Sequence, residues 1–347
     1  MKMTNTNQLL ADSPLSELDP RFGTYLKKTK AAHASHMLGN GVTDYAYKSD
    51  LELRKKLDSI PGAYDTIRKI TSTYVAQEIQ KANLTDVAVG PDQFPEIYAL
   101  GCDCAKRLGI AVPNIYVRHS EEMNAMTFAC DDLEPIIIIY SKMVKRMTLG
   151  ELKCVIGHEC GHIHNYHGVY NTLSTYLLIG GLYAAAGVAG TLLAQLQGLI
   201  TYGMDMTLKM WSRAAEVTAD RAALICCDNL EDAYNVNKKL LYGGNEFEDK
   251  ITTDLNIETL REQLQMSMDN PTGLLELYMD HPLSIKRIIA EMEFAQCDVF
   301  YKWRPDLKKP GATVYSKKVA DERCKKYIDV VRKKEKNNGK NSIIPKN

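Results

Sequence analysis

The stretch GHECGHIHNYH at residues 157–167 contains the motif His-Glu-x-x-His and so dictates local structure. Residues four apart on an α-helix differ by about 40° around its axis, so the imidazoles of His158 and His162 project from one face. Two neutral imidazole nitrogens at this spacing reach a single Zn²⁺ at about 2.0–2.1 Å. Glu159 lies on the shoulder of that face, where it can accept a proton from a metal-bound water without being a ligand. The motif therefore predicts a helix and part of a zinc site.

The residues before the motif also favour a helix. Thr148 suits a helix N-cap, and Glu151 follows three positions later, as in a capping box. Leu152, Val155 and Ile156 are apolar, as expected for a helix with a buried face.

A zinc site needs a third protein ligand, and the histidines that follow do not supply it on a continuous helix. A metzincin pattern requires a glycine three residues after His162 and a histidine six residues after it, but Asn165 and Gly168 stand there. On a continuing helix, His164 and His167 point about 200° and about 140° away from His162. They are interpreted as solvated groups or as supports for the ligands.

A later helix offers a carboxylate instead. Residues 211–224, WSRAAEVTADRAAL, are rich in alanine, and Glu216 and Asp220 share one helical face because they are four apart. We interpret Glu216 as the third ligand and Asp220 as the acceptor of an N–H from a ligating imidazole. The alternative is two exposed acids paired with Arg213 and Arg221. The ligand interpretation is favoured because a His-Glu-x-x-His helix precedes this segment.

Four separated segments resemble one family, the zinc metallopeptidases that include HtpX and the CAAX prenyl proteases. They are Asn-Ala-Met at 124–126, GELKCVIGHECGHIHNYH at 150–167, SRAAEVTADRAAL at 212–224, and Asp-His-Pro at 280–282 followed by Arg287. A weaker similarity covers QFPEIYALGCDCAKRLGIAVPNIYV at 93–117. Their order and spacing agree with the family.

The resemblance implies a gluzincin-like site with one Zn²⁺ per chain. By this similarity His158, His162 and Glu216 are the zinc ligands, Glu159 is the general base, and Asp220 orients a ligand. The implied activity is hydrolysis of peptide bonds by a metal-activated water.

The same resemblance covers two further residues. His281 either approaches the open metal position, as a catalytic group, or caps the helix that begins at Pro282, and both interpretations stay open. Arg287 is interpreted as an ion-pair partner rather than as a catalytic group.

The resemblance also predicts where a substrate binds. Asn124, Ala125 and Met126 lead into a strand that would present an unpaired edge, to which an extended polypeptide adds a strand. Such binding tolerates many sequences, which suits protein quality control. The alternative function is a chaperone-like peptide-binding protein of the same fold, with structural zinc or none and little turnover.

Three strand-like runs, at 114–118, 125–130 and 135–140, predict a small antiparallel sheet, while a helix over 91–108 is expected to stop at Gly109. The fold class is therefore α+β and mostly helical, with a zincin-like metallopeptidase domain. The expected parts are a disordered N-terminus at 1–20, a helical segment at 21–82, the metallopeptidase domain at 83–300, and a helical extension with a basic tail at 301–347.

Residues 168–204 carry no charged side chain, and 176–194 are about long enough to cross a bilayer. A single crossing is incompatible with a shared metal site, because His162 and Glu216 must lie on the same side. Two alternatives follow for residues 173–200: a hairpin buried beside the site, which we favour, or a shallow hairpin inserted into a membrane.

The charge and cysteine content restrict partners and compartment. The chain has 43 basic and 43 acidic residues, so no global charge steers it toward nucleic acid. Its nine cysteines form no C-x-x-C pair, and the N-terminus lacks an apolar run of signal-peptide length. We expect a cytoplasmic protein that is not secreted, with membrane association through the hairpin as the alternative.

Overall fold

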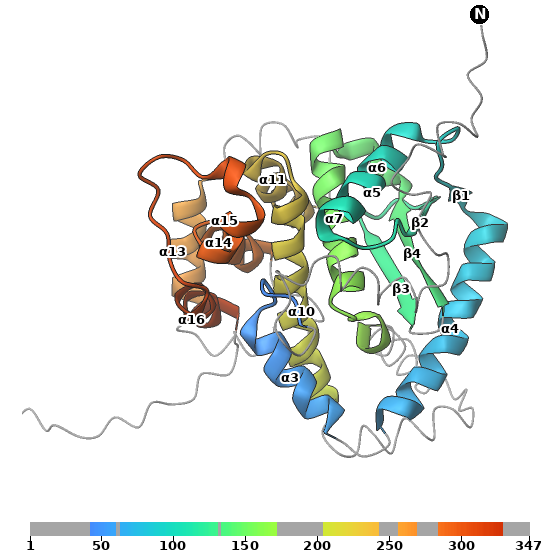
Figure 1. Ribbon diagram of the computed structural model, residues 1–347, viewed down its shortest axis with the longest axis horizontal. Coiled ribbons are helices and arrows are strands. Elements are labelled where there is room, and N and C mark those ends of the chain that lie inside the picture. Colours follow the sequence, from blue (N-terminus) through green and yellow to red (C-terminus); the bar gives the residue numbers. More distant parts are fainter. Residues whose placement is uncertain are drawn as a thin grey trace, which may run out of the picture.

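The computed structural model describes residues 42–59, 63–130, 133–171, 204–242, 256–268 and 284–328. Within them the chain is mostly helical and carries one four-stranded sheet (Figure 1), so the predicted α+β class is confirmed. The described helices are α3 (Lys48–Asp58), α4 (Ala63–Thr85), α5 (Pro95–Leu108), α6 (Ser141–Arg146), α7 (Leu149–His164), α10 (Met204–Cys226), α11 (Leu230–Tyr242), α13 (Ile257–Met268), α14 (Ser284–Phe294), α15 (Asp298–Trp303) and α16 (Lys317–Ile328), with a 3₁₀ turn at Pro305–Leu307.

The sheet is mixed, so the prediction of an antiparallel sheet is wrong in one respect. Its strand order is β1 (Val87–Ala88), β2 (Asn114–Arg118), β4 (Leu133–Tyr140), β3 (Ala125–Cys130). The β3–β4 hairpin and the β1–β2 pair are antiparallel, but β2 runs parallel to β4. After β2 the chain forms β3 one strand position away from β2, and β4 then lies between β2 and β3. This order leaves β3 at an edge of the described sheet.

The central strand β4 is covered on both faces, which explains its uninterrupted apolar run. Ile137 and Ile139 belong to the core shared with α5 and α7, whereas Ile136 and Ile138 face the core that includes α4. A strand buried on both faces needs apolar residues at every position rather than at alternate ones. The sheet thus lies between α4 and the helices that carry the site (Figure 1).

Two glycines on α7 let it pack closely along α10. A Cβ added at Gly157 would lie 2.6 Å from the Cβ of Cys226, and one added at Gly161 would lie 2.6 Å from the Cβ of Ala222. These separations are well below a carbon–carbon contact of about 3.5–4.0 Å. The backbones of α7 and α10 therefore approach each other without an intervening side chain.

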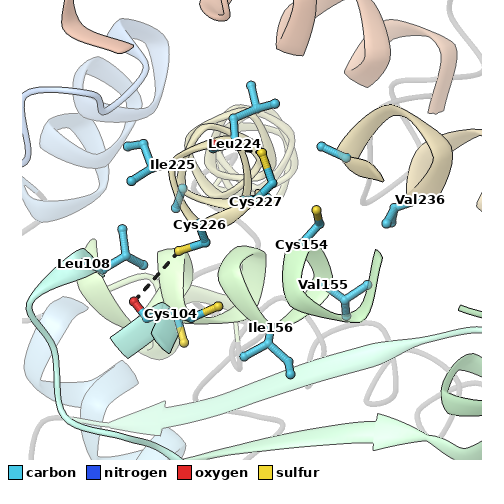
Figure 2. Close-up of a cluster of buried hydrophobic side chains, with 14 of the residues drawn as sticks. Cys104, Leu108, Cys154, Val155, Ile156, Leu224, Ile225, Cys226, Cys227 and Val236 are labelled. Atoms are coloured by element: carbon cyan, nitrogen blue, oxygen red, sulfur yellow. Dashed lines mark hydrogen bonds between the residues drawn. The ribbon is translucent and has the colours of Figure 1, made fainter. Parts of the chain in front are cut away.

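The core between α5, α7 and α10 is rich in thiols (Figure 2). Cys104, Cys154, Cys226 and Cys227 lie among aliphatic side chains, and the Cys226 thiol donates a hydrogen bond to the carbonyl oxygen of Cys104 at 3.9 Å. All nine cysteines are free. Burial raises the pKa of the Cys226 thiol well above its ordinary value, so Cys226 packs as a small neutral hydrophobe.

Several predicted features lie outside the described residues: the N-terminus at 1–20, the segment 173–200, His281 and the basic tail after residue 328. In the part of the chain that the structure describes, no helix combines the length and the apolar character required to cross a bilayer.

Candidate metal centre

Helix α7 begins with the predicted capping box. The Thr148 hydroxyl accepts a hydrogen bond from the Glu151 backbone N–H at 3.2 Å, and the Glu151 carboxylate accepts one from the Thr148 N–H at 2.7 Å. Each contact satisfies a backbone or side-chain group that the first helical turn would otherwise leave unpaired. The start of the helix, and with it the orientation of the motif one to two turns later, is therefore fixed locally.

Three side chains from α7 and α10 converge on one point. His158 Nε2 lies 3.2 Å from His162 Nε2, and Glu216 places one carboxylate oxygen 3.3 Å from His158 Nε2 and the other 3.4 Å from His162 Nε2. A tetrahedral ion with bonds of about 2.0–2.1 Å holds its ligand atoms about 3.3 Å apart. Among the described residues these three form the group of donors that suits a metal ion, and its spacing matches zinc.

His158 is oriented by an ion pair on its far side. Its Nδ1 lies 2.9 Å from an oxygen of Asp220, and Arg287 on α14 donates to both oxygens of the same carboxylate at 2.9 and 2.6 Å. Because Asp220 accepts the Nδ1–H, the neutral imidazole of His158 directs an unprotonated Nε2 at the donor cluster. Asp220 thus lies against a predicted ligand, and Arg287 lies against Asp220.

The carboxylates give the centre a negative potential. Burial alone would lower the pKa of His158, but Asp220 and Glu216 raise it to about 10. Burial by itself would raise the pKa of Asp220, yet the Arg287 guanidinium and His158 hold it below its ordinary value. The arrangement therefore favours a cation between His158 and Glu216.

Glu159 is held by the sheet. The Thr127 hydroxyl of β3 donates to a carboxylate oxygen of Glu159 at 2.6 Å and lies 3.3 Å from the Glu159 backbone carbonyl. This contact aims a carboxylate that is 6% exposed toward the same cavity as the metal ligands. Sequence reasoning missed Thr127, although its place in an edge strand beside the motif helix was a usable signal.

The end of α7 contradicts the expectation of a continuing helix. Tyr166 adopts a left-handed backbone conformation with φ of 58°. Its N–H donates a hydrogen bond to the carbonyl oxygen of Ile163 at 3.2 Å, and the His167 N–H donates one to the carbonyl oxygen of His162 at 3.0 Å. These two bonds form a Schellman motif, which reverses the chain at a helix end. His167 consequently returns to His162. Of the two alternatives given for His164 and His167, solvated groups are wrong because both side chains are buried, whereas His167 lies against the predicted ligand His162, as a support for that ligand would.

A cavity of about 470 Å³ surrounds the cluster, and Asn124, Ala125 and Met126 line it together with Thr127 and Glu159. Its other end reaches α11 and α14 and is mostly apolar; it is lined by Met143, Cys154, Val155, Ala223, Ala233, Val236, Asn237, Leu240 and Glu291. The cavity therefore joins the edge strand, the predicted base and the three donors in one space.

A His-Glu-x-x-His helix beside a small sheet, completed by a carboxylate from a second helix, defines a zincin-type metallopeptidase. The chain belongs to peptidase family M48, whose sequence profile matches residues 91–293. That range contains the three clustered donors, Glu159 and Asp220, whereas α3 and α4 precede it.

Curated relatives agree with this family. The chain is 28% identical to the "Plastoglobule-localized metallopeptidase 48, chloroplastic" of Arabidopsis thaliana, over 70% of each chain. It is 24% identical to a "Protease HtpX homolog" of Thermoplasma volcanium, over 65% of this chain and 78% of the relative. It is 25% identical to the "Protease HtpX" of Tolumonas auensis, over 54% of this chain and 69% of the relative. No solved structure gives a significant match.

Proposed function

We propose that the protein is a zinc endopeptidase with one ion per chain, held by His158, His162 and Glu216. The observation that carries this proposal is the close approach of three donor side chains. The two Nε2 atoms lie 3.2 Å apart, and the two Glu216 oxygens lie 3.3 Å from His158 Nε2 and 3.4 Å from His162 Nε2, separations that suit the ligands of one tetrahedral zinc. A zinc ion bound there would polarise the scissile carbonyl and lower the pKa of the attacking water.

Glu159 moves the proton in this proposal. Its carboxylate accepts a proton from the attacking water and delivers it to the departing amine nitrogen. The Thr127 hydroxyl holds one carboxylate oxygen at 2.6 Å, which leaves the other to face the water. Asp220 keeps His158 in the tautomer that presents Nε2.

We infer that the substrate is an extended polypeptide that adds a strand beside β3. Three observations support this: β3 is an edge of the described sheet, its residues Ala125 and Met126 line the cavity together with the preceding Asn124, and Thr127 connects the strand to Glu159. Strand addition uses backbone hydrogen bonds and so accepts many sequences. Unfolded or loosely structured chains are the substrate class, as in protein quality control.

Two variants test the zinc and the base separately. Glu216→Ala removes a donor and is expected to abolish stoichiometric zinc in elemental analysis. Glu159→Gln is expected to retain zinc while cleavage of unfolded casein falls at least about 100-fold, because it removes the proton acceptor. Wild-type protein without zinc, or normal cleavage by Glu159→Gln, would contradict the proposal. Zinc binding without cleavage would favour the chaperone-like alternative.

The substrate class is tested by offering one protein in two states. Reduced, carboxymethylated ribonuclease is expected to be cleaved and native ribonuclease to resist, because only the former presents extended segments. Equal cleavage of both states would refute strand addition by unfolded chains.

A further inference from the structure

We propose that Asp50 and His167 position the metal ligand His162, so that a helix ahead of the family-matched residues completes the active site. The inference rests on the proposed zinc site. It concerns the protein's own hydrogen bonds, which join α3 to the end of α7 and then to a ligand.

The chain of contacts begins at the ligand. His162 Nδ1 lies 2.9 Å from His167 Nδ1, and His167 Nε2 lies 3.1 Å from a carboxylate oxygen of Asp50. A carboxylate only accepts, so His167 donates its Nε2–H to Asp50. In a neutral His167 the Nδ1 is then an acceptor, and His162 must donate its Nδ1–H to it. His162 therefore presents an unprotonated Nε2 to the cluster, as a metal ligand must.

Asp50 is itself fixed by two donors from α10. Trp211 Nε1–H donates to one carboxylate oxygen at 2.9 Å, and the Thr218 hydroxyl donates to the other at 2.7 Å. The residue is 1% exposed, so an unpaired carboxylate there would be costly. His167 is the third donor to this carboxylate, and with its Nε2–H on Asp50 the other ring nitrogen of His167 faces His162.

Ring packing holds His167 in the same place. Its ring meets Trp211 edge-on, with centroids 5.5 Å apart and planes at 90°, and lies 5.2 Å from the His162 ring. His167 is 1% exposed. The imidazole is thus confined sterically as well as by hydrogen bonds, which is what a positioning residue requires.

The segment that carries Asp50 also forms hydrogen bonds with the residues at the end of α7. The Arg54 guanidinium donates to the carbonyl oxygen of Asn165 at 2.7 Å, and the Thr43 hydroxyl donates to the Asn165 side-chain oxygen at 2.5 Å. These bonds stabilise the turn that brings His167 back to His162. The N-terminal segment therefore both forms the turn and directs the histidine within it.

The two ligand histidines are supported symmetrically, but by different parts of the chain. His158 rests on Asp220, which Arg287 holds, and His162 rests on His167, which Asp50 holds. Asn171 Nδ2 also lies 3.1 Å from His162 Nδ1, but an amide nitrogen only donates and so cannot accept the Nδ1–H that His167 accepts. Only the amide oxygen of Asn171 could replace His167 as the acceptor, and if it did, removing the His167 contact would leave zinc affinity unchanged.

The test is zinc affinity, measured on the full chain by competition with a chromophoric chelator. His167→Phe keeps an aromatic ring but cannot accept the N–H of His162, so zinc should bind about 10- to 100-fold more weakly. His167→Gln offers a carbonyl to His162 and an N–H to Asp50, so it should recover most of the affinity. Asp50→Asn, which is nearly isosteric, should weaken binding in the same direction as His167→Phe.

A matched control comes from Tyr170→Phe. The Tyr170 hydroxyl donates to Asp58 at 2.5 Å and so joins α3 to the residues after α7, without contact with His162. This variant should bind zinc within about twofold of wild type. Circular dichroism and thermal unfolding of the zinc-free proteins identify any variant that has not folded, and Asp50→Asn then replaces His167→Phe as the deciding variant.

Three outcomes are distinguishable. Weaker zinc binding by His167→Phe and Asp50→Asn, with recovery in His167→Gln, supports the inference. Wild-type affinity in folded His167→Phe and Asp50→Asn overturns it, as does an equal loss in Tyr170→Phe. Wild-type protein that binds no zinc refutes the proposed function instead.

Discussion

Replacing Gly161 with alanine would force apart the two helices that carry the proposed zinc ligands. The new Cβ would lie 2.6 Å from the Cβ of Ala222 and 3.1 Å from the Cα of Ala219. Contacting carbons prefer about 3.5–4.0 Å, so α7 and α10 must separate by about 1 Å. Zinc–ligand distances tolerate only about 0.2 Å. We therefore expect zinc affinity to fall at least about tenfold.

The same substitution has two opposing effects on the free energy of unfolding. Alanine is better than glycine in a helix interior by about 0.5–1 kcal/mol, whereas overpacking a close contact costs about 1–3 kcal/mol. The net expectation for Gly161→Ala is a loss of about 1–2 kcal/mol. At Gly101 on α5 the added Cβ meets only the end of the flexible Ile115 side chain, at 2.7 Å. Gly101→Ala should therefore be neutral, or stabilising by up to about 1 kcal/mol.

Urea unfolding of the zinc-free proteins and chelator competition measure the two quantities. We infer from the close packing at Gly161 that the distance between α7 and α10 determines the ligand geometry. This inference would be refuted if Gly161→Ala bound zinc like wild type and were no less stable than Gly101→Ala. A loss of stability with unchanged zinc affinity would also refute the link between helix separation and the site.

Three other perturbations address neighbouring groups. Thr127→Val removes the hydroxyl that holds Glu159, so kcat for steady-state casein hydrolysis should fall about tenfold. KM and the zinc content should not change, and a parallel loss of zinc would contradict this prediction. Asp220→Asn should weaken zinc binding about 10- to 100-fold. Because it leaves Arg287 with the longer contact to the Glu216 carboxylate, at 3.7 Å, it should also lower the free energy of unfolding by about 3 kcal/mol; unaltered values in both assays would exclude the orienting role. Removal of the metal with EDTA should abolish cleavage. Zinc added back at 100 times its Kd should raise the free energy of unfolding by about 2.7 kcal/mol. A thermal midpoint unaffected by zinc would argue against a zinc site in the folded state.

Local elements of this fold could be predicted from the sequence because their signals are local. The runs at 114–118 and 125–130 are the observed β2 and β3, and Gly109 ends α5 with a left-handed φ of 67°. Strand order could not be predicted in the same way. The pairing of β2 with β4 depends on burying β4 between α4 and the other helices, and no short sequence window contains that information.

The residues of the site also differ in whether a local sequence signal predicts them. The spacing of His158, His162 and Glu216 reveals donors on two helices, and the structure brings these donors together. For His167 the sequence left two alternatives open, a solvated group or a support for the ligands, because the left-handed turn at Tyr166 that returns His167 to His162 lacks the glycine that usually marks such a turn. Asp50 precedes His167 by 117 positions, and the sequence around a buried aspartate in a helix does not indicate which distant residue it contacts.

The supports of the metal centre are drawn from positions as distant as Asp50 on α3 and Arg287 on α14. A ribosome must therefore release nearly every described element before the centre is complete. A nascent chain that ends before α14 has His158 and Asp220 but no guanidinium to hold them. On the proposed function, hydrolytic competence therefore arrives late in synthesis, after α14 has left the ribosome.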